Sequence, residues 1–196
     1  MRGRCRAAAD TAICLFCTLL LDDCLPLTRA APYNISVPTP ATASLDLALP
    51  DLAATAALAA RLAAVARPGD VVALHGTLGM GKTTFARAFI RRLADAEEEV
   101  PSPTFTLVQS YDTPAGVIWH FDLYRLDRPE DVWELGFEDA LYDGITLVEW
   151  PERLGDALPA RRLDLHLLPG PTPESRRALL AASSGSDFLS RMEAIP

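Results

Sequence analysis

The stretch ALHGTLGMGKTTFARAF, residues Ala73–Phe89, decides the fold of this chain. It contains Gly76, four further residues and then Gly81-Lys82-Thr83, which matches the phosphate-binding pattern G-x-x-x-x-G-K-[ST]. The apolar run VVALH just before it predicts a buried strand. After it, apolar residues recur at helical spacing as far as Leu93. Strand, glycine-rich turn and helix together form the geometry in which backbone N–H groups converge on an anion.

The lysine of this motif is the only lysine in the chain. The other 17 of the 18 basic side chains are arginines. A compact ammonium fits between the β- and γ-phosphates of a nucleotide, where a planar guanidinium does not. The choice of lysine at position 82 therefore favours a working phosphate loop over a chance glycine-rich turn.

Length and charge limit the classes of protein that fit. At 196 residues the chain suits one α/β domain with extensions. Its net charge of −8 argues against a protein that binds nucleic acid by itself through the phosphates. Small phosphorylated ligands or cationic surfaces of partner proteins are more natural targets.

The first residues of the chain allow several interpretations. The Cys14-x-x-Cys17 pair suggests a metal or redox site, but it lies in an apolar run without further paired ligands. Arginines followed by this run resemble a secretory signal, and the run is too short to span a membrane. An export signal, an organelle presequence and an upstream start outside the working protein are the alternatives, and we favour the last. We expect residues 1–44 to be a disordered extension, 45–168 the domain and 169–196 a C-terminal tail.

The remaining elements complete an α/β prediction. We expect a three-layer, P-loop NTPase-like sandwich whose mixed sheet has a parallel core and an antiparallel hairpin. The strands are expected at 45–49, 71–75, 106–111, 117–126 and 145–150, with an edge strand at 161–168; the helices are expected at 51–66 (capped by Asp51), 84–93, 129–135 and 151–158, with one more near 176–182.

Two of these strands end in a carboxylate. Asp122 closes VIWHFD and Glu149 closes ITLVE, and ligands gather at the carboxyl ends of parallel strands. With the Thr83 hydroxyl, these acids are candidate Mg²⁺ or water ligands; a salt bridge or a helix cap is the alternative for each. Trp150 either borders the nucleotide or belongs to the core. The histidines have no assigned role and are expected to pack in strands (His75, His120 and His166).

Missing motifs exclude other phosphate-loop classes. A Ras-type GTPase needs N-K-x-D to read guanine, but the only asparagine, Asn34, precedes the loop. An ABC-type signature, L-S-G-G-Q, is also absent. A small-molecule kinase needs an arginine-bearing lid, and the segment with Arg125 and Arg128 is short for one.

The motifs GTLGMGKTT, SPTFTLVQSY, HFDLYRL and LVEWPERL, in this order, closely resemble the TsaE (YjeE) family over about Asp46 to Leu168. The resemblance implies a cytoplasmic ATP/ADP-binding, weakly hydrolysing protein of bacterial threonylcarbamoyladenosine biosynthesis. It implies that the protein acts with the TsaB–TsaD pair, which modifies tRNAs reading ANN codons, and that it meets tRNA only through that complex. The alternatives are a nucleotide-sensing module whose hydrolysis is incidental and a small-molecule kinase.

The resemblance also assigns roles to residues of this chain. It implies that Ser102-Pro103-Thr104 forms a switch-like loop near the γ-phosphate, with Thr104 among the catalytic residues beside Lys82. It assigns Asp122 and Glu149 to the Mg²⁺ ion and the attacking water, with Thr83 as a further metal ligand. The residues implied to hold the nucleotide are Gly76, Thr77, Leu78, Gly79, Met80, Gly81, Lys82, Thr83, Thr84 and Trp150. Thr77 and Met80 depart mildly from the residues that are common in the family.

Overall fold

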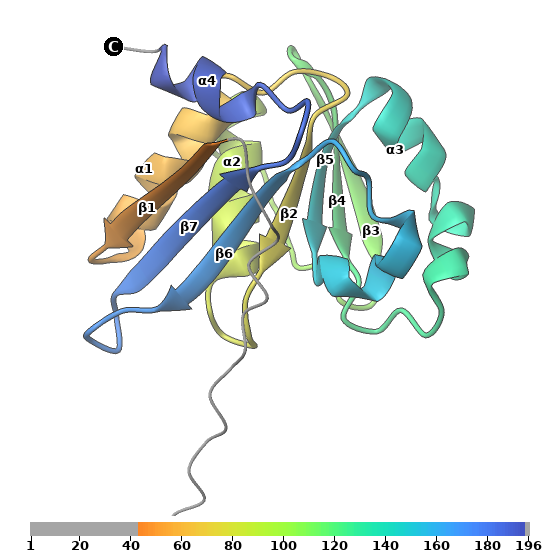
Figure 1. Ribbon diagram of the computed structural model, residues 1–196. Helices are drawn as coiled ribbons and strands as arrows, with labels where there is room; N and C mark the ends of the chain where they lie inside the picture. Colours follow the sequence, from red (N-terminus) through yellow and green to blue (C-terminus); the bar gives the residue numbers. More distant parts are fainter. Residues whose placement is uncertain (1–42, 195–196) are drawn as a thin grey trace, which may run out of the picture. The chain divides into compact units, whose positions relative to one another are not determined.

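The computed structural model describes residues 43–194, and the expectations for residues 1–42, including the cysteine pair, lie outside this range. The described chain alternates between strands and helices (Figure 1). The strands are β1 (Ala43–Leu49), β2 (Val71–His75), β3 (Val108–Thr113), β4 (Gly116–Asp122), β5 (Ile145–Glu149), β6 (Leu163–Pro169) and β7 (Arg176–Ala182). The helices are α1 (Leu52–Ala63), α2 (Lys82–Leu93), α3 (Phe137–Asp143) and α4 (Phe188–Glu193), with 3₁₀ helices η1 (Pro129–Leu135) and η2 (Pro151–Ala157).

The strands form one mixed sheet, in the order β1-β7-β6-β2-β5-β4-β3. The neighbouring pairs among β6, β2, β5 and β4 are parallel. The hairpin β3–β4 is antiparallel, and so are the pairs β6–β7 and β1–β7. The predicted α/β fold, with a mixed sheet that has a parallel core and an antiparallel hairpin, is therefore confirmed.

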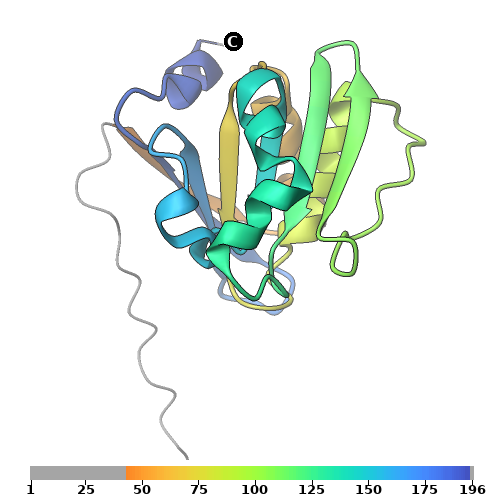
Figure 2. The ribbon, with the colours of Figure 1, turned by 90° about the vertical axis from the view of Figure 1, so that its right-hand side faces the viewer.

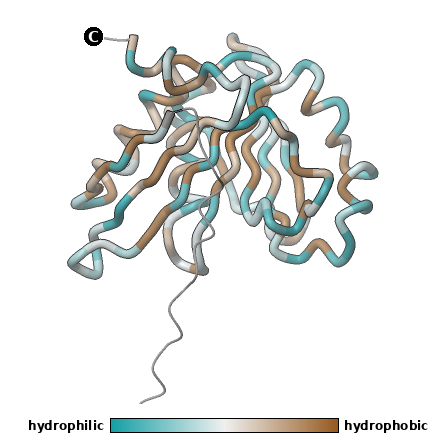
Figure 3. Tube along the Cα trace, in the orientation of Figure 1, coloured by the Kyte–Doolittle hydropathy of each residue, from teal (hydrophilic) through white to brown (hydrophobic). Residues whose placement is uncertain are grey.

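Helices cover both faces of this sheet, as the two views at right angles show (Figures 1 and 2). On one face α1 and α2 pack on alternate strand residues such as Leu74 and Leu147. On the other face α3, η1 and η2 pack on residues such as Phe121 and Val148. Hydrophobic residues concentrate along the strands and helix faces, while the connections are mostly hydrophilic (Figure 3). The period-two alternation of the strands therefore serves two separate cores.

Local sequence signals explain the first helices. Asp51 caps α1, since its carboxylate accepts a hydrogen bond from the backbone N–H of Ala54 at 2.8 Å. Helix α2 buries Phe85, Phe89 and Ile90 on one face, as their spacing predicts. The predicted short helices near 129–135 and 151–158 are present as 3₁₀ turns, and α3 and α4 were not foreseen.

The C-terminal part of the prediction is wrong. The segment Arg176–Ala182, expected as a helix, is strand β7, and β6, expected at an edge, lies between β2 and β7. Residues 169–196, predicted as a tail, continue the domain as far as they are described. The alanines of this segment favour a helix locally, but backbone pairing with strands on both sides outweighs that preference.

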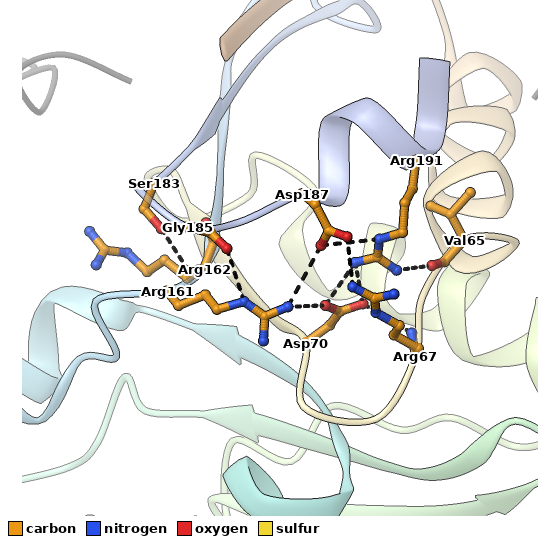
Figure 4. Close-up of polar contacts among 9 residues, drawn as sticks. All are labelled: Val65, Arg67, Asp70, Arg161, Arg162, Ser183, Gly185, Asp187 and Arg191. Atoms are coloured by element: carbon orange, nitrogen blue, oxygen red, sulfur yellow. Dashed lines mark hydrogen bonds and ion pairs between the residues drawn. The ribbon is translucent and has the colours of Figure 1, made fainter. Parts of the chain in front are cut away.

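Helix α4 is tied to the domain by ion pairs around a buried carboxylate (Figure 4). Asp70, which precedes β2 and is only 4% exposed, accepts two hydrogen bonds from Arg191 at 2.8 and 2.7 Å. Arg191 also donates to the carbonyl oxygen of Val65, while Asp187 pairs with Arg67 at 2.6 Å. Breaking such a buried pair leaves an unpaired charge, so these contacts specify where the C-terminal segment docks.

The described helices include none with the length and apolar composition that a bilayer crossing requires. The four parallel strands all point the same way, so their carboxyl ends share one edge of the sheet. His75, Asp122 and Glu149 end three of these strands. The phosphate-loop motif begins directly after His75, so this edge carries the candidate site.

Candidate functional site

Three glycines of the loop between β2 and α2 have positive φ, and Gly76 and Gly81 show why glycine is needed there. Gly76 has a φ of 144°, and a Cβ atom there would lie 2.8 Å from the carbonyl oxygen of Leu167. Gly81, which caps the N-terminus of α2, has a φ of 101°, in the left-handed region. The loop can therefore bring its backbone N–H groups and the start of α2 together, which is how helix N-termini bind anions.

Lys82, the first residue of α2, packs against this loop, with only 4% of the residue exposed. Its Nζ donates hydrogen bonds to the carbonyl oxygens of Gly76 at 2.6 Å and Thr77 at 3.2 Å. It also lies 3.6 Å from the centre of the Trp150 ring, a cation–π contact. Burial lowers the pKa of Lys82, while Glu149 and nearby carboxylates oppose that shift. These contacts hold the ammonium against the loop.

Glu149 is the carboxylate that faces the loop. It is 2% exposed, and its Oε2 accepts a hydrogen bond from the hydroxyl of Thr83 at 3.0 Å. Its other oxygen, Oε1, lies 2.9 Å from Nε2 of His120. Two of the three predicted metal ligands, Thr83 and Glu149, are therefore in direct contact.

Asp122 has different hydrogen-bond partners from Glu149. Its Oδ2 accepts hydrogen bonds from the hydroxyls of Thr104 at 2.7 Å and Ser102 at 3.2 Å. Its Oδ1 accepts one from the backbone N–H of Tyr124 at 3.2 Å. Asp122 thus joins the predicted switch-like loop to the end of β4, and it has no direct contact with Thr83 among the described hydrogen bonds.

These residues surround one cavity of about 290 Å³. Lys82, the helix start, both carboxylates and Thr104 line it, so the structure brings the predicted catalytic residues together. Gly76, Thr77 and Met80 belong to the loop but do not line the cavity. The lining residues are Leu78, Gly79, Gly81, Lys82, Thr83, Thr84, Ser102, Thr104, Asp122, Tyr124, Glu149 and Trp150.

Two aromatic rings close one side of the cavity. Trp150 lies at 4.9 Å from Tyr124, measured between ring centres. Its backbone adopts a φ of 60°, a left-handed conformation that is uncommon outside glycine and concentrates at functional sites. Trp150 therefore lines the cavity and also packs on a core cluster.

Sequence reasoning missed three residues of the site. Tyr124 lies within the motif HFDLYRL, so its place beside Asp122 could have been inferred. His120 was taken as a packing residue, although the alternation of β4 puts it on the same face as Asp122. Arg176 of β7 lies 3.3 Å from the carbonyl oxygen of Met80 and supports the loop from a segment predicted as a tail. No local signal could have found this last contact.

The donor groups fit a Mg²⁺ ion. They are oxygens only: the hydroxyl of Thr83, the carboxylates of Glu149 and Asp122, and the hydroxyls of Ser102 and Thr104. Within residues 43–194 no group of three or more His, Cys, Asp or Glu side chains is placed to hold a metal. One or two carboxylates that share the ion with phosphate oxygens is the usual arrangement for Mg²⁺.

The stacked pair of His75 and His166 makes the free energy of unfolding depend on pH. His166 stacks on His75 with 4.2 Å between ring centres, and burial followed by repulsion from His75 lowers its pKa to about 4. The folded state therefore binds a proton on His166 less readily than the unfolded state does. The contribution of the neutral His166 ring to the free energy of unfolding is complete above pH 6.5 and falls as the pH drops from 6.5 towards 4. We expect a loss of at most about 2 kcal/mol between pH 7.5 and 5, and less with solvent screening of the partly exposed ring.

The measurement is urea unfolding at both pH values for the natural chain and for His166→Gln, which cannot be protonated. The decrease in the free energy of unfolding between pH 7.5 and 5 should be smaller in the variant. An equal drop in both proteins would assign the acid sensitivity to other groups.

Comparisons with known proteins point to one family. A family model described as threonylcarbamoyl adenosine biosynthesis protein TsaE matches residues 49–178. The protein of this name from Rickettsia felis is 39% identical over 146 residues, covering 72% of this chain and 83% of its own length. The Bacillus subtilis protein of the same name is 41% identical over 113 residues, covering 57% and 69%.

The crystal structure of YdiB from Bacillus subtilis superimposes with a TM-score of 0.63 at 28% identity, covering 77% of this chain and 93% of its own. The family model's match spans the phosphate loop and both carboxylates and ends within β7. The chain belongs to the TsaE family of threonylcarbamoyladenosine biosynthesis proteins.

Proposed function

We propose that this protein binds ATP with Mg²⁺ and hydrolyses it slowly, as a step that serves threonylcarbamoyl transfer to tRNA by the TsaB–TsaD pair. One observation carries the proposal: Lys82 and Thr83 of the loop, Asp122 and Glu149 all line one cavity at the start of α2. A cation, a helix N-terminus and oxygen ligands in one place suit a nucleotide's phosphates and their metal.

Each side chain has a task in this proposal. The ammonium of Lys82 binds the phosphates, and Thr83 with Glu149 would hold the Mg²⁺ ion. That ion, when bound, supplies positive charge against the phosphate oxygens. Asp122 holds Ser102 and Thr104, which places the switch-like loop over the cavity. Trp150 and Tyr124 line the site with their neighbouring rings.

Two features support a partner-dependent enzyme. No arginine lines the cavity among the described residues, so the charge that develops on the γ-phosphate lacks a second cation. Arg125, the nearest candidate in sequence, lies over the ring of Phe105 at 4.6 Å. The apolar side chains of Leu78 and Phe105, near the cavity, are 76% and 83% exposed. In this proposal a partner that docks beside the cavity covers these two side chains.

Titration calorimetry with ATP, in Mg²⁺ and in EDTA, tests the metal assignment. Thr83→Ala should weaken ATP binding by about 10-fold or more in Mg²⁺, because a lost ligand group costs on this scale. In EDTA the change should be small. Thr83→Ser keeps the hydroxyl and is the matched control. Equal losses in Mg²⁺ and EDTA would remove Thr83 from the metal site.

A further inference from the structure

His120 is a buried polar side chain that the assignments above leave without a task. It lies on β4 and is 0% exposed. Its Nε2 is 2.9 Å from Oε1 of Glu149, and the contact is buried on both sides. Its Nδ1 has no hydrogen-bond partner among the residues that the structure describes. The contact with Glu149 is therefore the one polar interaction that the ring makes within this part of the chain.

The register of the parallel strands creates this contact. Asp122 of β4 pairs with Glu149 of β5, and His120 pairs with Leu147. Because side chains alternate along a strand, His120 and Asp122 point to the same face, two residues apart. The imidazole thus lies beside the Glu149 carboxylate, on the side away from the hydrogen bond to Thr83.

The two oxygens of Glu149 are divided between two elements. Oε2 accepts the hydroxyl hydrogen of Thr83 at the start of α2, and Oε1 faces His120 of β4. A carboxylate that is 2% exposed needs hydrogen-bond donors, because an unsatisfied buried oxygen is costly. With Oε1 held by the ring, Oε2 stays directed at the phosphate loop.

We infer that His120 is a positioning residue: it donates Nε2–H to Oε1 of Glu149 and thereby fixes the orientation of the carboxylate toward Thr83 and the nucleotide cavity. The consequence for turnover rests on the proposed function, whereas the hydrogen bond itself does not. A carboxylate oxygen only accepts, so the ring must carry its proton on Nε2. Outer partners of this kind orient metal-binding carboxylates and typically change metal affinity or activity 10- to 100-fold, roughly.

The first test needs no nucleotide. Long-range ¹H–¹⁵N NMR of the three histidines, with the His120 signals assigned by their loss in His120→Gln, reports which ring nitrogen carries the proton. A proton on Nε2 is expected. A neutral ring with its proton on Nδ1 would overturn the inference, since such a ring cannot donate to Glu149.

The second test separates positioning from packing. His120→Leu fills the space without a donor, whereas His120→Gln places an amide N–H where Nε2 was. With the ATPase assay at saturating ATP, His120→Leu should lower kcat by about 10-fold or more and raise the Mg²⁺ concentration for half-maximal turnover, with little change in KM for ATP. His120→Gln should restore most of kcat. In a Glu149→Gln background, His120→Leu should add almost nothing, because its effect passes through the carboxylate.

The outcomes are distinguishable from failure of the proposed function. A natural chain without ATP turnover contradicts the proposed function and leaves the NMR result to decide on the hydrogen bond. A natural chain that turns over ATP, combined with equal losses in His120→Leu and His120→Gln, overturns the inference. The inference is also overturned if His120→Leu lowers kcat by the same factor in the Glu149→Gln background as in the natural chain.

Discussion

Lys82→Ala is expected to lower ATP turnover by at least about 100-fold, the scale of a lost charge clamp on the transferring phosphate. The ammonium is almost fully buried and lies against the carbonyl oxygens of Gly76 and Thr77. No other cationic side chain lines the cavity in the described part of the chain. Its removal would therefore leave the phosphates with only the helix N-terminus and the metal.

Steady-state ATP hydrolysis measures this effect, and Arg91→Ala is the matched control. Arg91 lies on the same helix and is exposed, so its charge is lost without a change in the cavity. We expect turnover of the control close to that of the natural chain. Near-normal turnover of Lys82→Ala would contradict the assignment of the whole site.

Glu149→Gln is expected to lower turnover by about 100-fold or more while ATP still binds, because carboxylates that act on water or metal typically contribute on this scale. The amide keeps the size of the side chain but removes its charge beside Thr83 and His120. We expect the loss in kcat, with a smaller change in ATP affinity measured in EDTA.

Asp122→Asn is the informative comparison. Asp122 contacts Ser102, Thr104 and the backbone of Tyr124, so its effect on turnover should pass through the switch-like loop. We expect a smaller loss than for Glu149→Gln, about 10-fold. If neither variant changes turnover or its Mg²⁺ dependence, both carboxylates are structural.

The nucleotide cavity was predictable because its signals are local. The pattern around Lys82 fixes a strand, a turn and a helix, and acids that end parallel strands must meet at the same edge. Asp122 and Glu149 could therefore be placed near the loop before the structure was known. The alternation of side chains alone does not show whether Asp122 or Glu149 faces Thr83, because that depends on the register between β4 and β5.

The segment that follows β6 was not predictable in the same way. Strand β7 is alanine-rich, and its identity as a strand comes from pairing with the preceding strand β6 and with β1, which is distant in sequence. The support that Arg176 gives the phosphate loop follows from that pairing. The ion pairs of Asp70 with Arg191 likewise join residues far apart in the chain. Such contacts are set by topology, which local propensity does not encode.

The most direct test of the account is ATP turnover by the purified protein, first alone and then with the TsaB–TsaD pair. A site without an arginine should turn over slowly alone, and a partner that orders the Ser102–Thr104 loop and adds a cation should raise the rate by ~10³-fold. The net charge of −8 suits docking to a more basic surface, so the stimulation should weaken at high salt. Fast turnover by the isolated protein that the pair leaves unchanged would contradict the account.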